Sequence, residues 1–141
     1  MSTPIAKFRS TMDNFLDEVT DWATSNEQRQ ELEKFRLKYN TGMKITPRDT
    51  VGLFIEGVSE FADQIMEGNE DFFLNDAVVP DDYAQLGTQL RLWWPDLPRE
   101  RKDYAIKSFK LLLMLGAIAT KNEQIRLVIN KYRDPSNPLQ F

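Results

Sequence analysis

The sequence predicts an all-α protein, folded as a single compact helical bundle of five to seven helices. Three observations favour this fold class. Apolar residues recur at steps of three and four through most of the 141 residues, which is the spacing of one helix face. Threonine, serine or asparagine stands before several of these segments, where helix N-caps are expected. No segment alternates apolar and polar residues for long enough to indicate a β-strand.

The first part of the chain predicts two helices paired as an antiparallel hairpin. Thr3 followed by Pro4 is typical of a helix start, because proline at the first helical position loses no hydrogen bond. Ser25 opens a capping-box pattern for the second helix. We expect this helix to end near Tyr39, because residues 40–45 read as a glycine stop followed by a short extended link.

The middle of the chain predicts three further helices. Thr46 precedes a proline and a long apolar stripe, which indicates a helix over residues 47–67. A short helical turn is expected over residues 70–76. The next helix is expected to open at Pro80 and to close before Pro95, because a residue that precedes proline disfavours helical geometry.

The last third predicts the central helix and the end of the domain. A helix starting near Pro98 is apolar on nearly all sides over residues 111–119, which is typical of a helix surrounded by others. Asn122 is positioned to cap a final helix. We therefore expect one helical domain over residues 1–133 and an extended C-terminal tail over residues 134–141, where two prolines prevent a helix.

The composition excludes several classes of function. The chain has no histidine and no cysteine, so it cannot form the common zinc sites, the histidine-based acyl-transfer triads or disulfides. Glycine signatures of nucleotide-binding loops and serine-nucleophile motifs are also missing. The sequence therefore predicts a protein that is not an enzyme and that binds neither a cofactor nor a metal.

Charge and hydropathy bear on partners and location. The net charge of −4 gives no overall attraction to DNA or to an anionic membrane. The longest apolar run, residues 111–119, is too short to span a bilayer. No secretory signal pattern is visible at the start. We expect an intracellular, cytoplasmic protein that has no membrane partner.

Four carboxylates share one face of the helix predicted over residues 47–67. They are Glu56, Glu60, Asp63 and Glu67. Helical di-iron sites add a Glu-x-x-His motif to such clusters, and this chain has no histidine. The pattern favours a solvated face, and a docking surface for a basic partner is the alternative.

A basic and aromatic stretch over residues 91–102 suggests a second kind of surface. Aromatic stacking combined with phosphate contacts is how single-stranded nucleic acids are commonly held. The candidate nucleic-acid-binding residues are Trp94, Arg99, Lys107 and Lys110. Acidic residues interleave with these, so we favour a tryptophan that plugs a helix junction and surface charges that compensate one another.

Two apolar groups are candidates for partner binding. Phe72 and Phe73 could form an exposed hook, although we favour their sealing one end of the bundle. Leu139 and Phe141 lie beyond two prolines, where no helix carries them. We expect these tail residues to dock into another chain, as extended segments often do.

The hydrophobic pattern resembles one known group of proteins. An amphipathic helix over residues 49–65 is followed by Glu-Asp-Phe-Phe-Leu at residues 70–74 and by a leucine-rich helix at residues 109–115. This order is similar to small all-helical proteins of unassigned activity from large double-stranded DNA viruses of algae and protists. The resemblance covers about residues 45–120. It implies a viral accessory or virion-associated protein, located in a host cell or a virion, and supplies no functional residues.

The leading hypothesis is a non-enzymatic protein–protein interaction or structural module that self-associates or packs against other proteins. The alternative is a nucleic-acid-associated adaptor that uses the local basic and aromatic patch.

Overall fold

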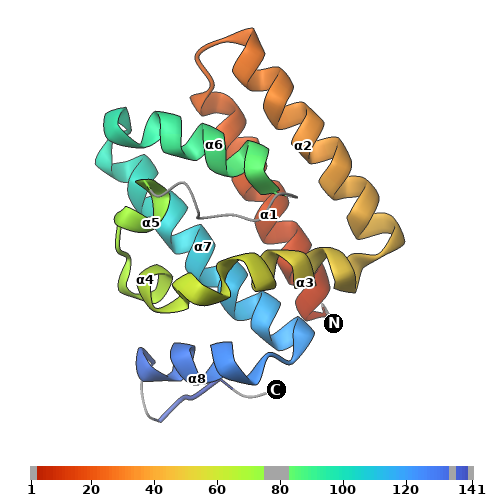
Figure 1. Cartoon of the computed structure of the whole chain (residues 1–141), viewed down its shortest axis with the longest axis vertical. Helices are drawn as coiled ribbons and strands as arrows, with labels where there is room; N and C mark the ends of the chain where they lie inside the picture. Colours follow the sequence, from red (N-terminus) through yellow and green to blue (C-terminus); the bar gives the residue numbers. More distant parts are fainter. Residues whose placement is uncertain (1–2, 75–82, 134–135, 140–141) are drawn as a thin grey trace.

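The computed structural model describes residues 3–74, 83–133 and 136–139, and these residues form an all-α bundle (Figure 1). Because α3, the 3-10 turn η1 and α4 follow one another without a break, the bundle has about seven helices in the described residues. The elements are α1 (Pro4–Trp22), α2 (Asn26–Ile45), α3 (Pro47–Val58), η1 (Ser59–Phe61), α4 (Ala62–Glu67), α5 (Asp71–Leu74), α6 (Ala84–Trp93), η3 (Trp94–Asp96), α7 (Arg99–Thr120) and α8 (Glu123–Lys131).

Helix α7 is the central helix, as its apolar pattern predicts. It packs most extensively along α1 and next along α3 (Figure 1). A Cβ atom at Gly116 would lie 2.5 Å from Cδ1 of Ile55 and 3.5 Å from Cε2 of Phe8. Glycine at this position therefore lets α7 approach α1 and α3 closely, and Leu112 beside it is fully buried.

Three predicted helix starts are confirmed by their caps. The Thr3 hydroxyl accepts a hydrogen bond from the Ala6 amide at 3.1 Å. The Ser25 hydroxyl accepts one from the Gln28 amide at 3.2 Å, and the Asn122 side chain accepts one from the Ile125 amide at 3.0 Å. Each cap satisfies one of the free amides at a helix N-terminus, so short-range pattern fixes these boundaries. The fourth candidate cap, Thr46, makes no such side-chain bond.

The predicted end of the second helix is wrong. Helix α2 continues through Gly42 to Ile45, and Met43 on its last turns is 3% exposed. A Cβ atom at Gly42 would lie 2.5 Å from Oγ1 of Thr50, so this glycine permits close contact with α3 and does not end the helix. Burial of Met43 outweighs the local stop signal, since tertiary packing overrides propensity.

Helices α1 and α2 run antiparallel and contact each other, as predicted, although α1 packs chiefly on α7 and α2 packs chiefly on α3 and α6 (Figure 1). The helix expected over residues 47–67 is continuous but tightens to a 3-10 turn at η1. The expected helix start at Pro80 lies outside the described residues. Within the described residues, α6 begins at Ala84. None of the described helices has both the length and the apolar character to cross a membrane.

Candidate functional site

The basic and aromatic stretch forms a closed contact around Glu70, here called the Glu70 junction. Trp94 is 1% exposed and stacks on Phe73, with ring centroids 4.2 Å apart and planes 7° apart. Its indole Nε1 donates a hydrogen bond to Oε1 of Glu70 at 3.1 Å. Trp94 therefore has no free ring face on which a base could stack, so the structure places it as a core residue.

Two cations of this stretch, Arg99 and Lys102, are paired within the Glu70 junction. Arg99 contacts Oε2 of Glu70 at 3.1 Å through Nη1 and Oδ1 of Asp103 at 2.9 Å through Nε. Lys102 Nζ lies 3.6 Å from Oε1 of Glu70. The hydrogen bond from Arg99, together with that from Trp94, lowers the pKa of the Glu70 carboxyl below its ordinary value. Compensated charge is thus the main property of the junction.

The remaining two nucleic-acid candidates lie further along α7. Lys107 is exposed and Lys110 is partly buried. The other two candidates do not share an open surface with these lysines, because Trp94 is buried and Arg99 forms an ion pair with Glu70. The structure therefore does not bring the four predicted residues together as one surface.

Phe72 and Phe73 seal one end of the bundle. Phe72 is fully buried and Phe73 is 4% exposed. Their ring centroids lie 5.5 Å and 5.2 Å from that of Phe109 on α7. The alternative of an exposed aromatic hook is therefore wrong for both residues.

The C-terminal tail packs on its own domain where it is described. Leu139 is 6% exposed, and its amide donates to Oδ1 of Asn130 on α8 at 2.7 Å. Arg133 Nε donates a hydrogen bond to the Asn137 carbonyl at 3.0 Å. The expectation that Leu139 is free to dock into another chain is wrong, because intramolecular burial already removes its side chain from water. Phe141 lies outside the described residues.

The predicted acidic face is tied to α8. The Tyr132 hydroxyl lies 2.9 Å from both Oδ1 of Asp63 and Oε1 of Glu67 and donates to these carboxylates. These hydrogen bonds, that to Asp63 first, raise the pKa of Tyr132 above its ordinary value. Glu56 and Glu60 are exposed. Within the described ranges no group of three or more acidic side chains is placed to hold a metal ion.

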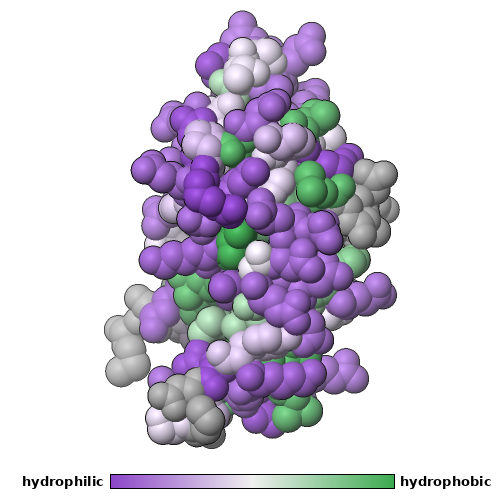
Figure 2. Space-filling view, turned by 90° about the vertical axis from the view of Figure 1, so that its left-hand side faces the viewer, coloured by the Kyte–Doolittle hydropathy of each residue, from purple (hydrophilic) through white to green (hydrophobic). Residues whose placement is uncertain are grey.

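Figure 2 shows the face formed by the ends of α4, α5, α6 and α8. Hydrophilic residues predominate there, and the apolar residues appear in separate small groups. Local hollows are therefore better candidates for binding than a broad apolar surface on this face.

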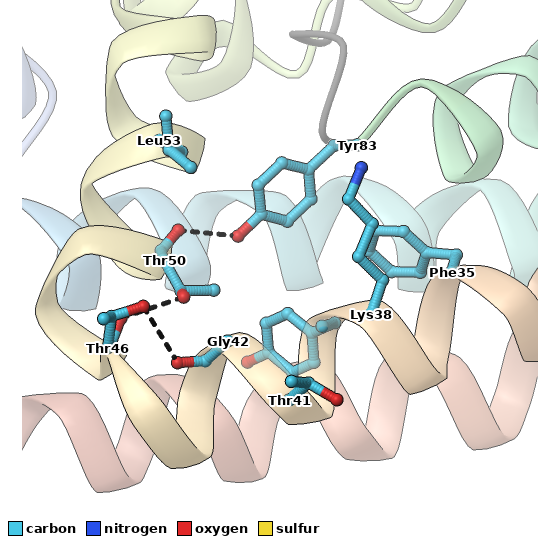
Figure 3. A pocket seen from close by; sticks show the side chains of 9 residues that line it. Phe35, Lys38, Thr41, Gly42, Thr46, Thr50, Leu53 and Tyr83 are labelled. Carbon is cyan, nitrogen blue, oxygen red and sulfur yellow. Dashed lines mark hydrogen bonds between the residues drawn. The ribbon is translucent and has the colours of Figure 1, made fainter.

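The first hollow, here called the α2–α3 pocket, is an apolar pocket of about 310 Å³ (Figure 3). Phe35, Tyr39 and Tyr83 supply aromatic walls. The Tyr83 hydroxyl donates to the Thr50 carbonyl at 2.8 Å, which fixes this ring against α3. The Tyr39 hydroxyl is buried and has no hydrogen-bond partner among the described residues, and burial raises the pKa of this phenol. Leu53, 40% exposed, also borders the pocket.

The surroundings of the α2–α3 pocket are apolar and basic. Ile45, between two pocket residues, is 71% exposed, and Leu37 two turns earlier on α2 is 70% exposed. The second half of α2, residues 36–45, contains three basic and no acidic side chains. Arg36 is paired with Asp17 at 2.7 Å. The face therefore offers exposed aliphatic groups within a locally positive setting.

The second hollow, here called the Trp22 crevice, measures about 410 Å³ and lies where α1, the start of α2 and the η3 turn meet. Trp22, Trp93 and Arg101 line it. Sequence reasoning missed all three, because it weighed the basic and aromatic stretch without the tryptophan at the end of α1. That tryptophan, at the last turn of an amphipathic helix, is the signal that could have pointed to it.

Comparison with known proteins returned no relative. No protein-family model matches the chain, and neither a curated protein nor a solved structure matches it.

Proposed function

We propose that this protein is a non-enzymatic protein–protein interaction module whose docking site is the α2–α3 pocket and its rim. The observation that carries the proposal is an apolar pocket of about 310 Å³ bordered by exposed aliphatic side chains. A pocket of this kind accepts one anchoring side chain, and such anchors contribute most of the affinity in protein interfaces.

The apolar rim supports a docked partner. Leu53 and Ile45 are 40% and 71% exposed. Burying an aliphatic side chain contributes about 1.5–3 kcal/mol relative to leaving it in water. A partner that covers both residues therefore gains free energy that the isolated chain does not have.

The charge of the face selects the partner's chemistry. Lys44 lies on the second half of α2, residues 36–45, which carry no acidic side chain, whereas the whole chain carries −4. Complementary charge across an interface favours encounter and suppresses wrong partners. The proposed partner is therefore an acidic segment of another protein with an aromatic or aliphatic anchor. A second copy of this acidic chain fits less well.

The viral role and the nucleic-acid alternative rest on the sequence alone. A viral accessory or virion-associated role rests on the sequence resemblance. The nucleic-acid alternative has less support, because Trp94 is buried and Arg99 is engaged with Glu70. A titration with single-stranded DNA at physiological salt tests this alternative, and binding that Lys107→Glu abolishes would favour it.

The test is selection of a displayed random-peptide library on the immobilised protein. We expect enriched peptides to carry a large apolar residue flanked by aspartate or glutamate. Leu53→Asp should weaken their binding by about tenfold or more, which corresponds to about 1.4 kcal/mol. Leu127→Asp is the matched control, because Leu127 is 57% exposed on α8, away from the pocket.

Three outcomes would contradict the proposal. The first is equal binding of the selected peptides to wild type and Leu53→Asp, with circular dichroism unchanged. The second is enrichment without acidic residues. The third is a concentration-dependent dimer, seen by light scattering, that Leu53→Asp dissociates, since this would make a second copy the partner.

A further inference from the structure

We infer that the Trp22 crevice binds a small aromatic carboxylate. The crevice shares no lining residue with the α2–α3 pocket and is independent of the interaction proposed there. The inference rests on the aromatic walls of the crevice and on two groups that have no partner among the described residues. These are the buried Trp22 indole N–H, which has no acceptor, and the Arg101 guanidinium, which has no ion pair.

The walls of the Trp22 crevice suit a flat apolar group. Trp22 and Trp93 meet edge to face, with ring centroids 6.3 Å apart and planes 76° apart. Leu97 and Pro98 add aliphatic surface where α7 begins. A volume of about 410 Å³ lies within the range of small-molecule pockets, roughly 300–1,000 Å³.

The Trp22 indole is a donor that lacks an acceptor. Trp22 is 3% exposed, and its Nε1 has no hydrogen-bond partner within the part of the chain that the structure describes. A buried donor left unpaired is unfavourable in the free protein. Because a tryptophan nitrogen only donates, a ligand group that satisfies it must carry a hydrogen-bond acceptor.

Gln28 adds to the excess of donors. Its Oε1 accepts hydrogen bonds from Trp93 Nε1 at 3.1 Å and from the Thr24 amide and hydroxyl at 2.7 and 3.1 Å. The acceptor side of this amide is thus used within the protein, and its NH₂ group is what it can offer to a ligand.

Arg101 supplies the positive charge. Its guanidinium lies 5.7 Å from the centroid of the Trp22 ring and is partly buried. It has no ion-pair partner in the described residues, although Arg99 two positions earlier has two. Among the described residues that line the crevice, Asp96 is the one acidic residue, and it is exposed. A carboxylate therefore fits beside Arg101, where charge-assisted, two-point hydrogen bonding is strongest.

The experiment is an NMR titration of the ¹⁵N-labelled protein with phenylacetate, using the indole N–H signals of the three tryptophans. We expect the Trp22 signal, assigned with Trp22→Phe, to shift with a dissociation constant of about 1 mM or tighter. The Trp94 signal should stay in place, because that indole is already bonded to Glu70. Phenylacetamide has the same shape without the charge, and it should bind at least about tenfold more weakly.

Variants separate the crevice from general charge attraction. Arg101→Gln should lower the affinity for phenylacetate by about tenfold or more. Arg99→Gln removes the same charge from the same first turn of α7 and should leave the affinity unchanged. The inference is overturned if the Trp22 signal does not move at a phenylacetate concentration of about ten times the expected dissociation constant. It is also overturned if phenylacetamide binds as tightly as phenylacetate, or if both arginine variants lose affinity to the same extent.

Discussion

The Glu70 junction and the Trp22 crevice both pair a tryptophan with an arginine, and they differ in whether a carboxylate joins the two. Each combines a buried tryptophan with an arginine from the first turn of α7. In the junction, Trp94 Nε1 and Arg99 both bond to Glu70. In the crevice, Trp22 Nε1 has no acceptor and Arg101 has no ion-pair partner among the described residues.

The difference lies in a carboxylate that comes from a distant part of the chain. Glu70 follows Gly68, whose φ of 71° is left-handed and ends α4. Oδ1 of Asn69 then accepts a hydrogen bond from the Asp71 amide at 2.9 Å, at the start of α5. This geometry presents Glu70 to α7, whereas no carboxylate of the described residues forms an ion pair with Arg101. A local sequence pattern thus shows where donors lie, whereas long-range folding decides which of them are satisfied.

The largest expected effect comes from emptying the Glu70 junction. Trp94→Ala should lower the free energy of unfolding by about 3–5 kcal/mol, because it removes a fully packed aromatic side chain. Urea midpoints measure this change. Leu92→Ala is the control, since Leu92 is 60% exposed and should change stability by less than about 0.5 kcal/mol. Similar losses in the two variants would mean that the junction is not closed.

Removal of the shared carboxylate should convert the junction into a second open crevice. Glu70→Ala leaves the buried Trp94 Nε1 without its acceptor, so we expect a loss of about 1–3 kcal/mol, measured by urea unfolding. Glu123→Ala breaks only the surface pair with Arg126 and should cost no more than about 1 kcal/mol. If the Glu70 and Glu123 variants lose the same stability, the Trp94 hydrogen bond contributes nothing measurable.

The smallest expected effect compares the two arginines directly. Arg99→Gln should lower stability slightly, because its exposed ion pairs are screened by water. Arg101→Gln should leave stability unchanged, since no carboxylate partner is lost. Thermal and urea unfolding at low salt give the best separation. A greater loss for Arg101→Gln would show that its contact with the Trp22 ring stabilises the fold.

The sequence predicts the helices better than the sites, for a physical reason. The fold class, the caps at Thr3, Ser25 and Asn122 and the central place of α7 depend on contacts between residues near one another in the chain or on one apolar face. Gly42 misled the prediction, because a glycine that ends a helix and one that admits a neighbouring helix look alike in sequence.

The candidate sites depend on long-range contacts that no local pattern contains. The sequence marks Trp94 as a candidate for ligand binding, with a plug at a helix junction as the favoured interpretation, and its burial against Phe73 agrees with that plug. Trp93 lines the Trp22 crevice. Leu139 looked unattached because no helix carries it, yet Asn130 on α8 holds its amide. In each case the deciding partner lies on another element, at a position that the sequence pattern does not mark.

The packing of α1 along α7 has a consequence for how the protein is made. Phe15 and Phe109, whose ring centroids lie 5.7 Å apart, come from nearly opposite ends of the chain. A ribosome that adds about 5–20 residues per second therefore exposes the apolar face of α1 for about 5–20 s before α7 emerges. During that interval the apolar face of α1 has no α7 to pack against, so the nascent chain exposes apolar surface until its last third is made.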